Sequence, residues 1–248
     1  MKITRYENAI FGLRPIIEAI NAGQEIDTLF IQKGLKGDIF PELWELVKRN
    51  RVNYKHVPVE KLNRLTRKNH QGVFAFVSPI TFHRTENVIP QLFEEGKIPL
   101  FLILDRVTDV RNFGAIVRSA ECSGVHAIIV PERGSAAING DAMKTSAGAL
   151  SSVPICREFN LKATIDFLKN SGIQVVACTE KTEDLIYAND FTIPTAIIMG
   201  SEEDGISEEY LKLCTRKTKI PMMGNIGSLN VSVSAGVILY EAVRQRKS

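Results

Sequence analysis

Small and polar residues gather near the carboxyl terminus, where the chain needs only to connect a strand to a helix. Residues 220–236 read Ile-Pro-Met-Met-Gly-Asn-Ile-Gly-Ser-Leu-Asn-Val-Ser-Val-Ser-Ala-Gly. Gly224 and Gly227 allow tight backbone conformations that a Cβ atom forbids. Ser228 and Asn230 place a hydroxyl and an amide just before an apolar helix, where helix caps and binding sites both occur. A simple turn needs one glycine and one cap, so this segment is the first candidate for a site.

A second polar loop, Asp-Arg-Val-Thr-Asp-Val-Arg-Asn-Phe-Gly over residues 105–114, precedes a helix that carries Arg118. The pattern predicts that Asn112 or Gly114 begins this helix, which leaves its first amides unpaired. Such amides with arginines nearby bind anions, so a phosphate group could dock there. Arg118 could instead pair with the carboxylate of Asp105 and serve only the structure.

A third loop reads Met-Gly-Ser-Glu-Glu-Asp-Gly over residues 199–205. Gly200 lets another group approach the backbone, Glu202 offers a carboxylate, and Gly205 permits a turn into the next helix. The pattern is weak alone, because acidic turns before helices are common. The chain contains neither Gly-x-Gly-x-x-Gly nor Gly-Lys-Ser/Thr. These absences count against a dinucleotide dehydrogenase and a nucleoside triphosphatase.

Apolar strands and helices alternate from residue 98 onward. Strands are expected at 100–104, 125–130, 173–178, 195–199 and near 217–220, and helices at 113–123, 161–170 and 206–214. Continuous Ile/Val/Leu strands between helices predict an α/β fold with a parallel sheet covered on both faces. The three polar loops each follow a strand, so they should converge at the carboxyl edge of the sheet, where ligands bind.

The first 78 residues form a separate, smaller pattern. Helices are expected at 11–21, 39–50 and 58–67, and strands at 26–32, 52–57 and 72–77. Prolines, a glycine and charged residues then predict a linker over 79–97. The domains are therefore expected at 1–78 and 98–248.

Composition limits the class of protein. With 44% hydrophobic and 24% charged residues, the chain is an ordinary globular protein. No apolar run approaches the ~20 residues of a membrane span, so no membrane partner is expected. The four cysteines are widely spaced, which argues against a zinc site or a disulfide framework. We expect buried structural thiols, no metal, and a reducing, cytoplasmic compartment.

Charge is distributed unevenly along the chain. Residues 1–78 hold 13 Lys+Arg against 8 Asp+Glu, a surplus of +5, whereas residues 79–248 hold 18 against 20, a balance of −2. Residues 48–68 contain eight basic side chains and one acidic one. Such a segment suits a nucleic-acid backbone, but a solvated basic face explains it equally well.

The three loops together resemble the three motifs of the SpoU branch of the SPOUT methyltransferases, which methylate RNA ribose 2′-hydroxyls with S-adenosylmethionine. The motifs read Asn112-x-Gly114-x-x-x-Arg118, Gly200-x-Glu202-x-x-Gly205 and Ile220-Pro-Met…Ser228-Leu-Asn-Val-Ser-Val. The whole chain is similar to bacterial 23S ribosomal RNA guanosine-2′-O-methyltransferases, to which Phe11-Gly12 and His70-Gln71-Gly72 also match.

The resemblance implies a fold and partners. The first domain would be an L30e-like RNA substrate-binding domain, and the second a parallel-sheet SPOUT domain with a trefoil knot. S-adenosyl-L-methionine would be the methyl donor, RNA the substrate, and the enzyme a homodimer. The final helix spreads apolar residues widely around its surface, which suits burial by a second subunit or enclosure within one.

The resemblance also implies roles for the motif residues. Backbone around Gly200, Ile220 and Leu229 would hold the donor. The family assigns the residue matching Arg118 a central role, sometimes as general base. Because free arginine is a poor base, we expect Arg118 to grip the target phosphate and stabilise alkoxide charge.

The remaining motif residues would support that chemistry. Asn112 and Asn230 would orient the ribose and the guanidinium. Glu202 would hold its neighbours by hydrogen bonds and is a second candidate base, while Ser228 would anchor the loop or the substrate.

Three alternatives stay open at this stage. The enzyme could act on transfer RNA or on a ribosomal adenosine. The chain could be a non-catalytic RNA-binding ribosome-assembly protein on the same scaffold. A nicotinamide-dependent oxidoreductase on a parallel sheet is a third reading, which lacks its phosphate fingerprint.

Overall fold

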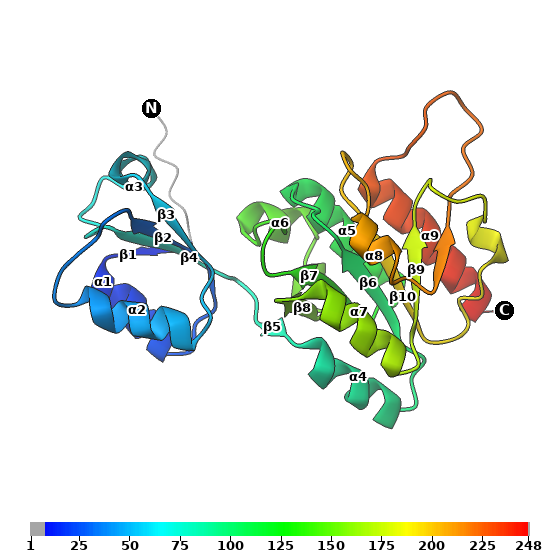
Figure 1. Cartoon of the computed structure of the whole chain (residues 1–248), viewed down its shortest axis with the longest axis horizontal. Coiled ribbons are helices and arrows are strands. Elements are labelled where there is room, and N and C mark those ends of the chain that lie inside the picture. Colours follow the sequence, from blue (N-terminus) through cyan, green and yellow to red (C-terminus); the bar gives the residue numbers. More distant parts are fainter. Residues whose placement is uncertain (1–7, 248) are drawn as a thin grey trace. The chain divides into compact units, whose positions relative to one another are not determined.

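Two compact units make up the computed structural model, which describes residues 8–247 (Figure 1). The first contains the residues up to Thr81 together with Ile138–Gly140, and the second contains the remaining residues from Phe82 onward.

The first unit is a four-stranded sheet with helices on both faces (Figure 1). Its strands, in spatial order, are β1 (Ala9–Phe11), β4 (Val73–Val77), β2 (Ile26–Gln32) and β3 (Tyr54–Val57). Strands β2 and β3 are parallel, and the other neighbours are antiparallel. Its helices are α1 (Leu13–Asn21), α2 (Phe40–Arg49) and α3 (Val59–Leu65).

Alternation of side chains along β2 divides the core of this unit into two layers. Leu29 and Ile31 are fully buried in the layer formed with α1 and α2. Phe30 points to the other face and packs with Leu62 of α3. A strand buried on both faces explains the continuous apolar run of its sequence.

The His70-Gln71-Gly72 motif connects β4 to the start of α1. The Leu13 amide donates to Oε1 of Gln71 at 3.0 Å, and the Gly72 amide donates to Nδ1 of His70 at 3.0 Å. Gln71 and Gly72 both have positive φ, at 51° and 79°. Gln71 therefore satisfies an orphan amide of the helix that follows Gly12, a structural task.

The second unit is built on a fully parallel seven-stranded sheet. In spatial order its strands are β11 (Arg216–Thr218), β9 (Gln174–Cys178), β10 (Thr195–Met199), β6 (Leu100–Leu104), β7 (Ala127–Pro131), β8 (Ile155–Glu158) and β5 (Phe82–His83). The central strands β6 and β10 are buried along their whole length. The parallel α/β fold expected from the sequence is confirmed.

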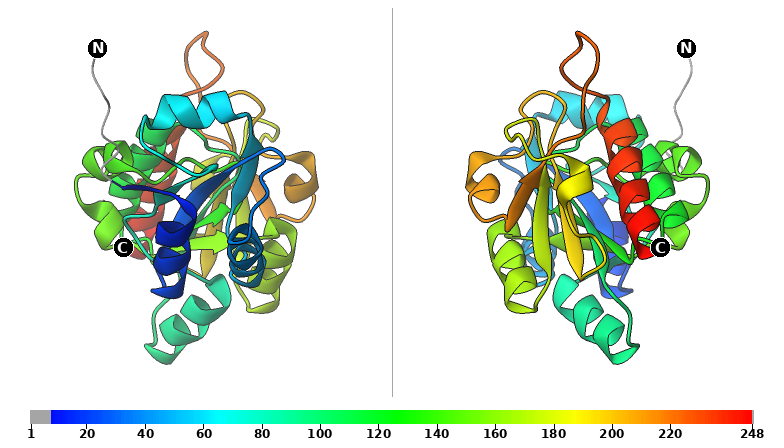
Figure 2. Two further views of the ribbon diagram at one scale, coloured as in Figure 1. Left: turned by 90° about the vertical axis from the view of Figure 1, so that its left-hand side faces the viewer. Right: turned by 90° about the vertical axis from the view of Figure 1, so that its right-hand side faces the viewer.

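Helices cover both faces of this sheet (Figure 2). One face carries α4 (Thr85–Glu94), α7 (Leu161–Asn170) and α8 (Glu208–Leu211), whose apolar residues share one core with the strands. On the other face α5 (Val110–Cys122) packs against α9 (Val231–Arg246). Shorter elements are α6 (Gly140–Thr145) and the 3-10 turns η1 (Ala149–Ser151) and η2 (Ile186–Ala188).

Several expected boundaries differ from the structure. The stretch 79–97, expected to be a linker, contains β5 and α4, and buried Ile89 and Leu92 pack α4 into the second core. Its prolines misled the prediction, because Pro90 lies inside α4. Strand β8 and helix α6 were not expected.

The start of α5 also corrects an expectation. The helix begins at Val110, not at Asn112 or Gly114. Asp109 is its N-cap, and Oδ1 of Asp109 accepts a hydrogen bond from the Asn112 amide at 2.7 Å. Asp is a preferred N-cap, so the sequence did carry this signal.

The cysteines occupy two kinds of environment. All four thiols are free, but Cys122 is exposed, so the expectation of four buried thiols is wrong at this position. Burial raises the pKa of Cys156 and of Cys178 to about 12, and that of Cys214 to about 11. Within residues 8–247, no helix is long and apolar enough to cross a membrane.

We expect one cysteine of the native chain to react with a thiol reagent at pH 8. Cys122 is accessible, whereas the raised pKa values keep the three other thiols protonated and unreactive. A colorimetric thiol titration should give one fast equivalent in the native state and four in denaturant. The Cys122→Ser variant should lose the fast equivalent, and a second fast thiol would contradict the burial described above.

Candidate active site

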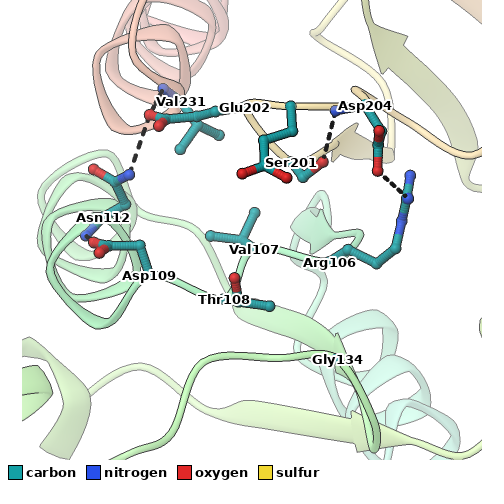
Figure 3. A pocket seen from close by; sticks show the side chains of 11 residues that line it. Arg106, Val107, Thr108, Asp109, Asn112, Gly134, Ser201, Glu202, Asp204 and Val231 are labelled. Atoms are coloured by element: carbon teal, nitrogen blue, oxygen red, sulfur yellow. Dashed lines mark hydrogen bonds and ion pairs between the residues drawn. The ribbon is translucent and has the colours of Figure 1, made fainter.

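A cavity of about 400 Å³ opens at the carboxyl edge of the parallel sheet (Figure 3). Its lining comes from the loop after β6, the start of α5, the loop after β10 and the start of α9. Four carboxylates line it, from Asp109, Glu202, Glu203 and Asp204, against the single guanidinium of Arg106. This edge is where ligands bind in open parallel sheets.

Three side chains distant in sequence meet at this cavity. Nδ2 of Asn112 donates to Oε1 of Glu202 at 3.1 Å, and Nδ2 of Asn230 donates to Oδ1 of Asn112 at 3.0 Å. Asn230 also donates to Oε1 of Glu202. The three residues come from α5, the β10 loop and the N-cap of α9, so one residue of each motif is present.

Glu202 lies at the amino terminus of α9. The Val231 amide donates to Oε1 of Glu202 at 3.2 Å, and Oδ1 of Asn230 accepts from the Ser232 amide at 2.9 Å. A carboxylate is favoured there by the unpaired amides and the helix dipole. Because Oε1 receives three donors, Glu202 acts as an anchor between two helices and its own loop.

Carboxylates occupy the amino terminus of α5, where a phosphate was expected. Asp109 caps the helix, and Asn112 turns its amide to Glu202. A phosphate placed among these carboxylates would meet like charge, so the geometry does not favour that site. Carboxylate oxygens instead accept hydrogen bonds from hydroxyl groups.

The loop that carries Glu202 is held by a buried carboxylate that sequence reasoning missed. Asp105 is 2% exposed, and its Oδ2 accepts from the amide and the hydroxyl of Ser207, at 2.7 and 2.6 Å. Its Oδ1 accepts from Nε of Arg106 at 3.2 Å. Asp105 therefore joins the loop after β6 to the end of the loop after β10.

Arg106 extends this connection across the mouth of the loops. Its guanidinium donates to Oδ2 of Asp204 at 2.9 Å and to the Gly205 carbonyl at 3.1 Å. The hydrogen bond to Asp105 raises the pKa of Arg106, so the guanidinium stays charged. Arg106 has a φ of 58°, a conformation that costs energy in a long side chain and is kept by these contacts.

Gly200 allows the loop after β10 to fold back on itself. A Cβ atom at Gly200 would overlap the backbone of Gly205 and Ile206. The Gly205 amide donates to the Ser201 carbonyl at 3.0 Å, and Gly205 has a φ of 66°. Both glycines of this motif therefore have a structural reason, independent of any ligand.

The other predicted residues do not line the cavity. Arg118 is exposed on α5, six residues after Asn112 and so about 9 Å along the helix axis. Within residues 8–247 it makes no hydrogen bond or ion pair, so the alternative pairing with Asp105 is not formed. Ser228 is also exposed, in the segment that precedes α9.

That segment, residues 220–229, stands away from the body of the unit (Figure 1). Ile220 is partly buried, whereas Leu229 is 38% exposed and Met223 is 96% exposed. In the described chain, no backbone–backbone hydrogen bond involves residues 220–229. Their amides, carbonyls and apolar side chains are thus available to a ligand or a partner that has both polar and apolar parts.

Two family models match the chain. The model described as the SpoU rRNA Methylase family matches residues 99–240. The model described as RNA 2'-O ribose methyltransferase substrate binding matches residues 9–83.

Curated relatives agree with these matches. A Staphylococcus aureus protein, assigned provisionally by name to the TrmH family of tRNA/rRNA methyltransferases, is 36% identical over 241 residues, covering 97% of both chains. The 23S rRNA (guanosine-2'-O-)-methyltransferase RlmB of Photorhabdus laumondii is 42% identical over 179 residues, 72% of this chain and 73% of that one.

Among solved structures, the SpoU methyltransferase AviRb of Streptomyces viridochromogenes in complex with AdoMet is similar to this chain. The TM-score is 0.61 at 28% identity, covering 96% of this chain and 90% of AviRb. The chain therefore belongs to the SpoU methylase family, and it is an RNA methyltransferase that uses AdoMet as methyl donor. Among the described residues, no group of three His, Cys, Asp or Glu side chains could hold a metal.

Asp105→Asn should destabilise the second unit more than Asp204→Asn. Asp105 is buried with three donors around it, whereas the side chain of Asp204 is 68% exposed. We expect losses of about 2–4 kcal/mol for Asp105→Asn and under ~1 kcal/mol for Asp204→Asn. Scanning calorimetry of the whole chain would measure both, and equal shifts would contradict the role of Asp105 as the main connection.

Proposed function

We propose that this enzyme methylates the 2′-hydroxyl of a guanosine in 23S ribosomal RNA, with the ribose bound at the cavity beside Asn112, Glu202 and Asn230. The observation that carries this proposal is the hydrogen-bonded cluster of these three side chains at a carboxylate-rich cavity. Carboxylate and amide oxygens can accept hydrogen bonds from sugar hydroxyls, whereas they repel phosphates.

The methyl donor would be held by the three loops at the carboxyl ends of β9, β10 and β11. AdoMet supplies a methyl group on a positively charged sulfur, which leaves without further activation. Gly200, Ile220 and Leu229 lie in two of these loops, and residues 220–229 offer unpaired backbone groups for polar contacts. The strand order β11-β9-β10, in which β11 returns beside β9, is compatible with the trefoil knot that we infer for this region.

Arg118 is assigned to the target phosphate and to the charge that develops on the ribose oxygen. Its guanidinium is exposed and without an ion pair in the described chain, unlike that of Arg106, so it can receive an anion without losing a partner. It lies along α5 beyond the carboxylates of the cavity, where like charge does not oppose a phosphate. Ser228 would contact the substrate or the donor from the exposed segment, and Glu202 would keep both asparagines oriented.

The first unit would hold the RNA through the surface of α3 and the adjoining loop. Lys61, Arg64, Arg67 and Lys68 are exposed there, and Lys55 extends from the same face of β3. Over residues 8–247 none of these five cations forms a salt bridge. Unpaired cations on one surface favour a phosphate backbone over a face that serves only solubility.

The guanosine of 23S ribosomal RNA is favoured by the RlmB relative, which shares 42% identity over 72% of this chain. A transfer RNA target is the alternative, because the S. aureus relative matches over nearly its full length and its name includes both RNAs. A ribosomal RNA substrate would place the enzyme in the cytoplasm. Mapping the ribose methylated in unmodified 23S ribosomal RNA, with transfer RNA as a parallel substrate, tests the proposal. Exclusive methylation of transfer RNA would refute it.

A homodimer through α9 is also proposed. Val233, Val237 and Tyr240 lie on one face of this helix and are 50, 37 and 53% exposed. Their spacing of four and three residues forms a continuous apolar strip. An exposed strip of this kind is typical of a subunit interface.

Arg118→Ala should lower the rate of methyl transfer by at least about 100-fold while AdoMet affinity stays within about twofold. Arg118→Lys should also fail, because lysine cannot provide a planar, bidentate contact. Single-turnover methylation and calorimetric titration with AdoMet measure the two effects. Arg216→Ala, which removes another exposed arginine of the same unit, is the matched control. Normal turnover by Arg118→Ala would refute the assignment.

Val237→Asp should convert the dimer to a monomer, because it buries an unpaired carboxylate at the proposed interface. Sedimentation velocity at micromolar concentration measures the change. Phe159→Asp, at a residue 71% exposed outside α9, should leave the dimer intact. A wild-type chain that sediments as a monomer would exclude the interface.

A further inference from the structure

An aromatic cluster lies on the first unit, on the face of its sheet opposite to α3. The ring centroids of Trp44 and Tyr54 are 5.0 Å apart, and those of Tyr54 and His56 are 5.5 Å apart. Trp44 and His56 are 6.2 Å apart. The three rings thus form one continuous group, from α2 to β3.

The cluster is open to solvent. Tyr54 is 36% exposed, His56 is exposed, and Trp44 is partly exposed. Strand β3 is the edge of the sheet and pairs only with β2. Tyr54 and His56 alternate with Lys55, so their rings share one face of that edge.

Cations surround the rings. Nζ of Lys48 lies 5.2 Å from the centroid of Trp44. The sequence from Glu45 to Glu60 contains four cations, Lys48, Arg49, Arg51 and Lys55, and no acidic residue between these two glutamates. In the part of the chain that the structure describes, none of the four forms a salt bridge. The charge complements a polyanion, and the rings complement a flat, uncharged group.

A role in folding accounts for only part of the cluster. Trp44 packs partly against the core between α1, α2 and the sheet, but Tyr54 and His56 do not belong to that core. In contrast, Gln71, from the motif that the family resemblance singled out in this unit, is engaged in holding the start of α1. The cluster is therefore surplus to the packing of the unit.

We propose that Trp44, Tyr54 and His56 are a stacking platform for unpaired bases of the RNA substrate. Bases that leave a loop or bulge stack on exposed aromatic rings, and nearby cations hold the flanking phosphates. The inference rests on the proposed function, which makes RNA the substrate. It adds that the first unit recognises a single-stranded element beside its basic α3 surface.

Trp44 is the only tryptophan of the chain, so its fluorescence reports on this platform directly. The whole protein would be titrated with a single-stranded oligoribonucleotide, a duplex of the same sequence and an abasic oligonucleotide of the same length. We expect strong quenching by the single strand and at least fivefold less by the other two. Equal quenching by all three, or none by the single strand, would overturn the proposal.

Variants separate stacking from charge. Tyr54→Ala combined with His56→Ala should weaken single-strand binding at least tenfold, whereas Tyr54→Phe should bind within twofold of wild type. Phe159→Ala, at an exposed aromatic residue of the second unit, is the control. Thermal unfolding of each variant shows whether the unit still folds. A folded double-alanine variant with wild-type affinity would overturn the proposal and leave a protein partner as the alternative occupant.

Methylation distinguishes failure of this proposal from failure of the proposed function. If wild type methylates 23S ribosomal RNA and the double-alanine variant does so with unchanged KM, the platform is refuted and the function stands. If the single strand quenches Trp44 but no ribosomal RNA is methylated, the platform stands and the target is wrong.

Discussion

One carboxylate oxygen, Oε1 of Glu202, holds together the segments from which the site is built. It accepts hydrogen bonds from Asn112 on α5, from Asn230 at the cap of α9 and from the Val231 amide. The two helices pack on the same face of the sheet. A charged acceptor at a helix amino terminus is stabilised by the unpaired amides, so the arrangement fixes both asparagines at the edge of the cavity.

Glu202 can do this because its loop is itself fixed. Gly200 lets the loop turn back against Gly205, and Asp105 and Arg106 join it to the loop after β6. The left-handed conformation of Arg106 is maintained by those same contacts. The motif residues are thus partly explained by folding, which leaves the exposed Arg118 and the segment 220–229 as the groups free to contact substrates.

The two units present different chemistry to one substrate. The second unit has a carboxylate-rich cavity that suits hydroxyl groups, with an unpaired arginine further along α5. The first unit carries unpaired cations around α3 and exposed aromatic rings on the other face of its sheet. Separation of phosphate binding from the cavity avoids like-charge repulsion at the site of reaction.

Local patterns in the sequence predicted much of the fold and part of the site. Strands such as Leu100–Leu104 and helices such as Leu161–Asn170 were predicted at their observed bounds, because their apolar periodicity reflects local geometry. Strand β5 and helix α4 were missed, because two residues pairing with β8 and a proline inside a helix carry no local signal.

The sequence by itself determined the three motifs, the parallel sheet and the convergence of polar loops at one edge. Only the tertiary structure decided that Asn112, Glu202 and Asn230 meet, and that Asp105 binds Ser207 and Arg106, not Arg118. The reason is physical: these contacts join residues up to 118 positions apart. The partner of a buried carboxylate is set by which loops the sheet brings together, and no spacing along the chain encodes that.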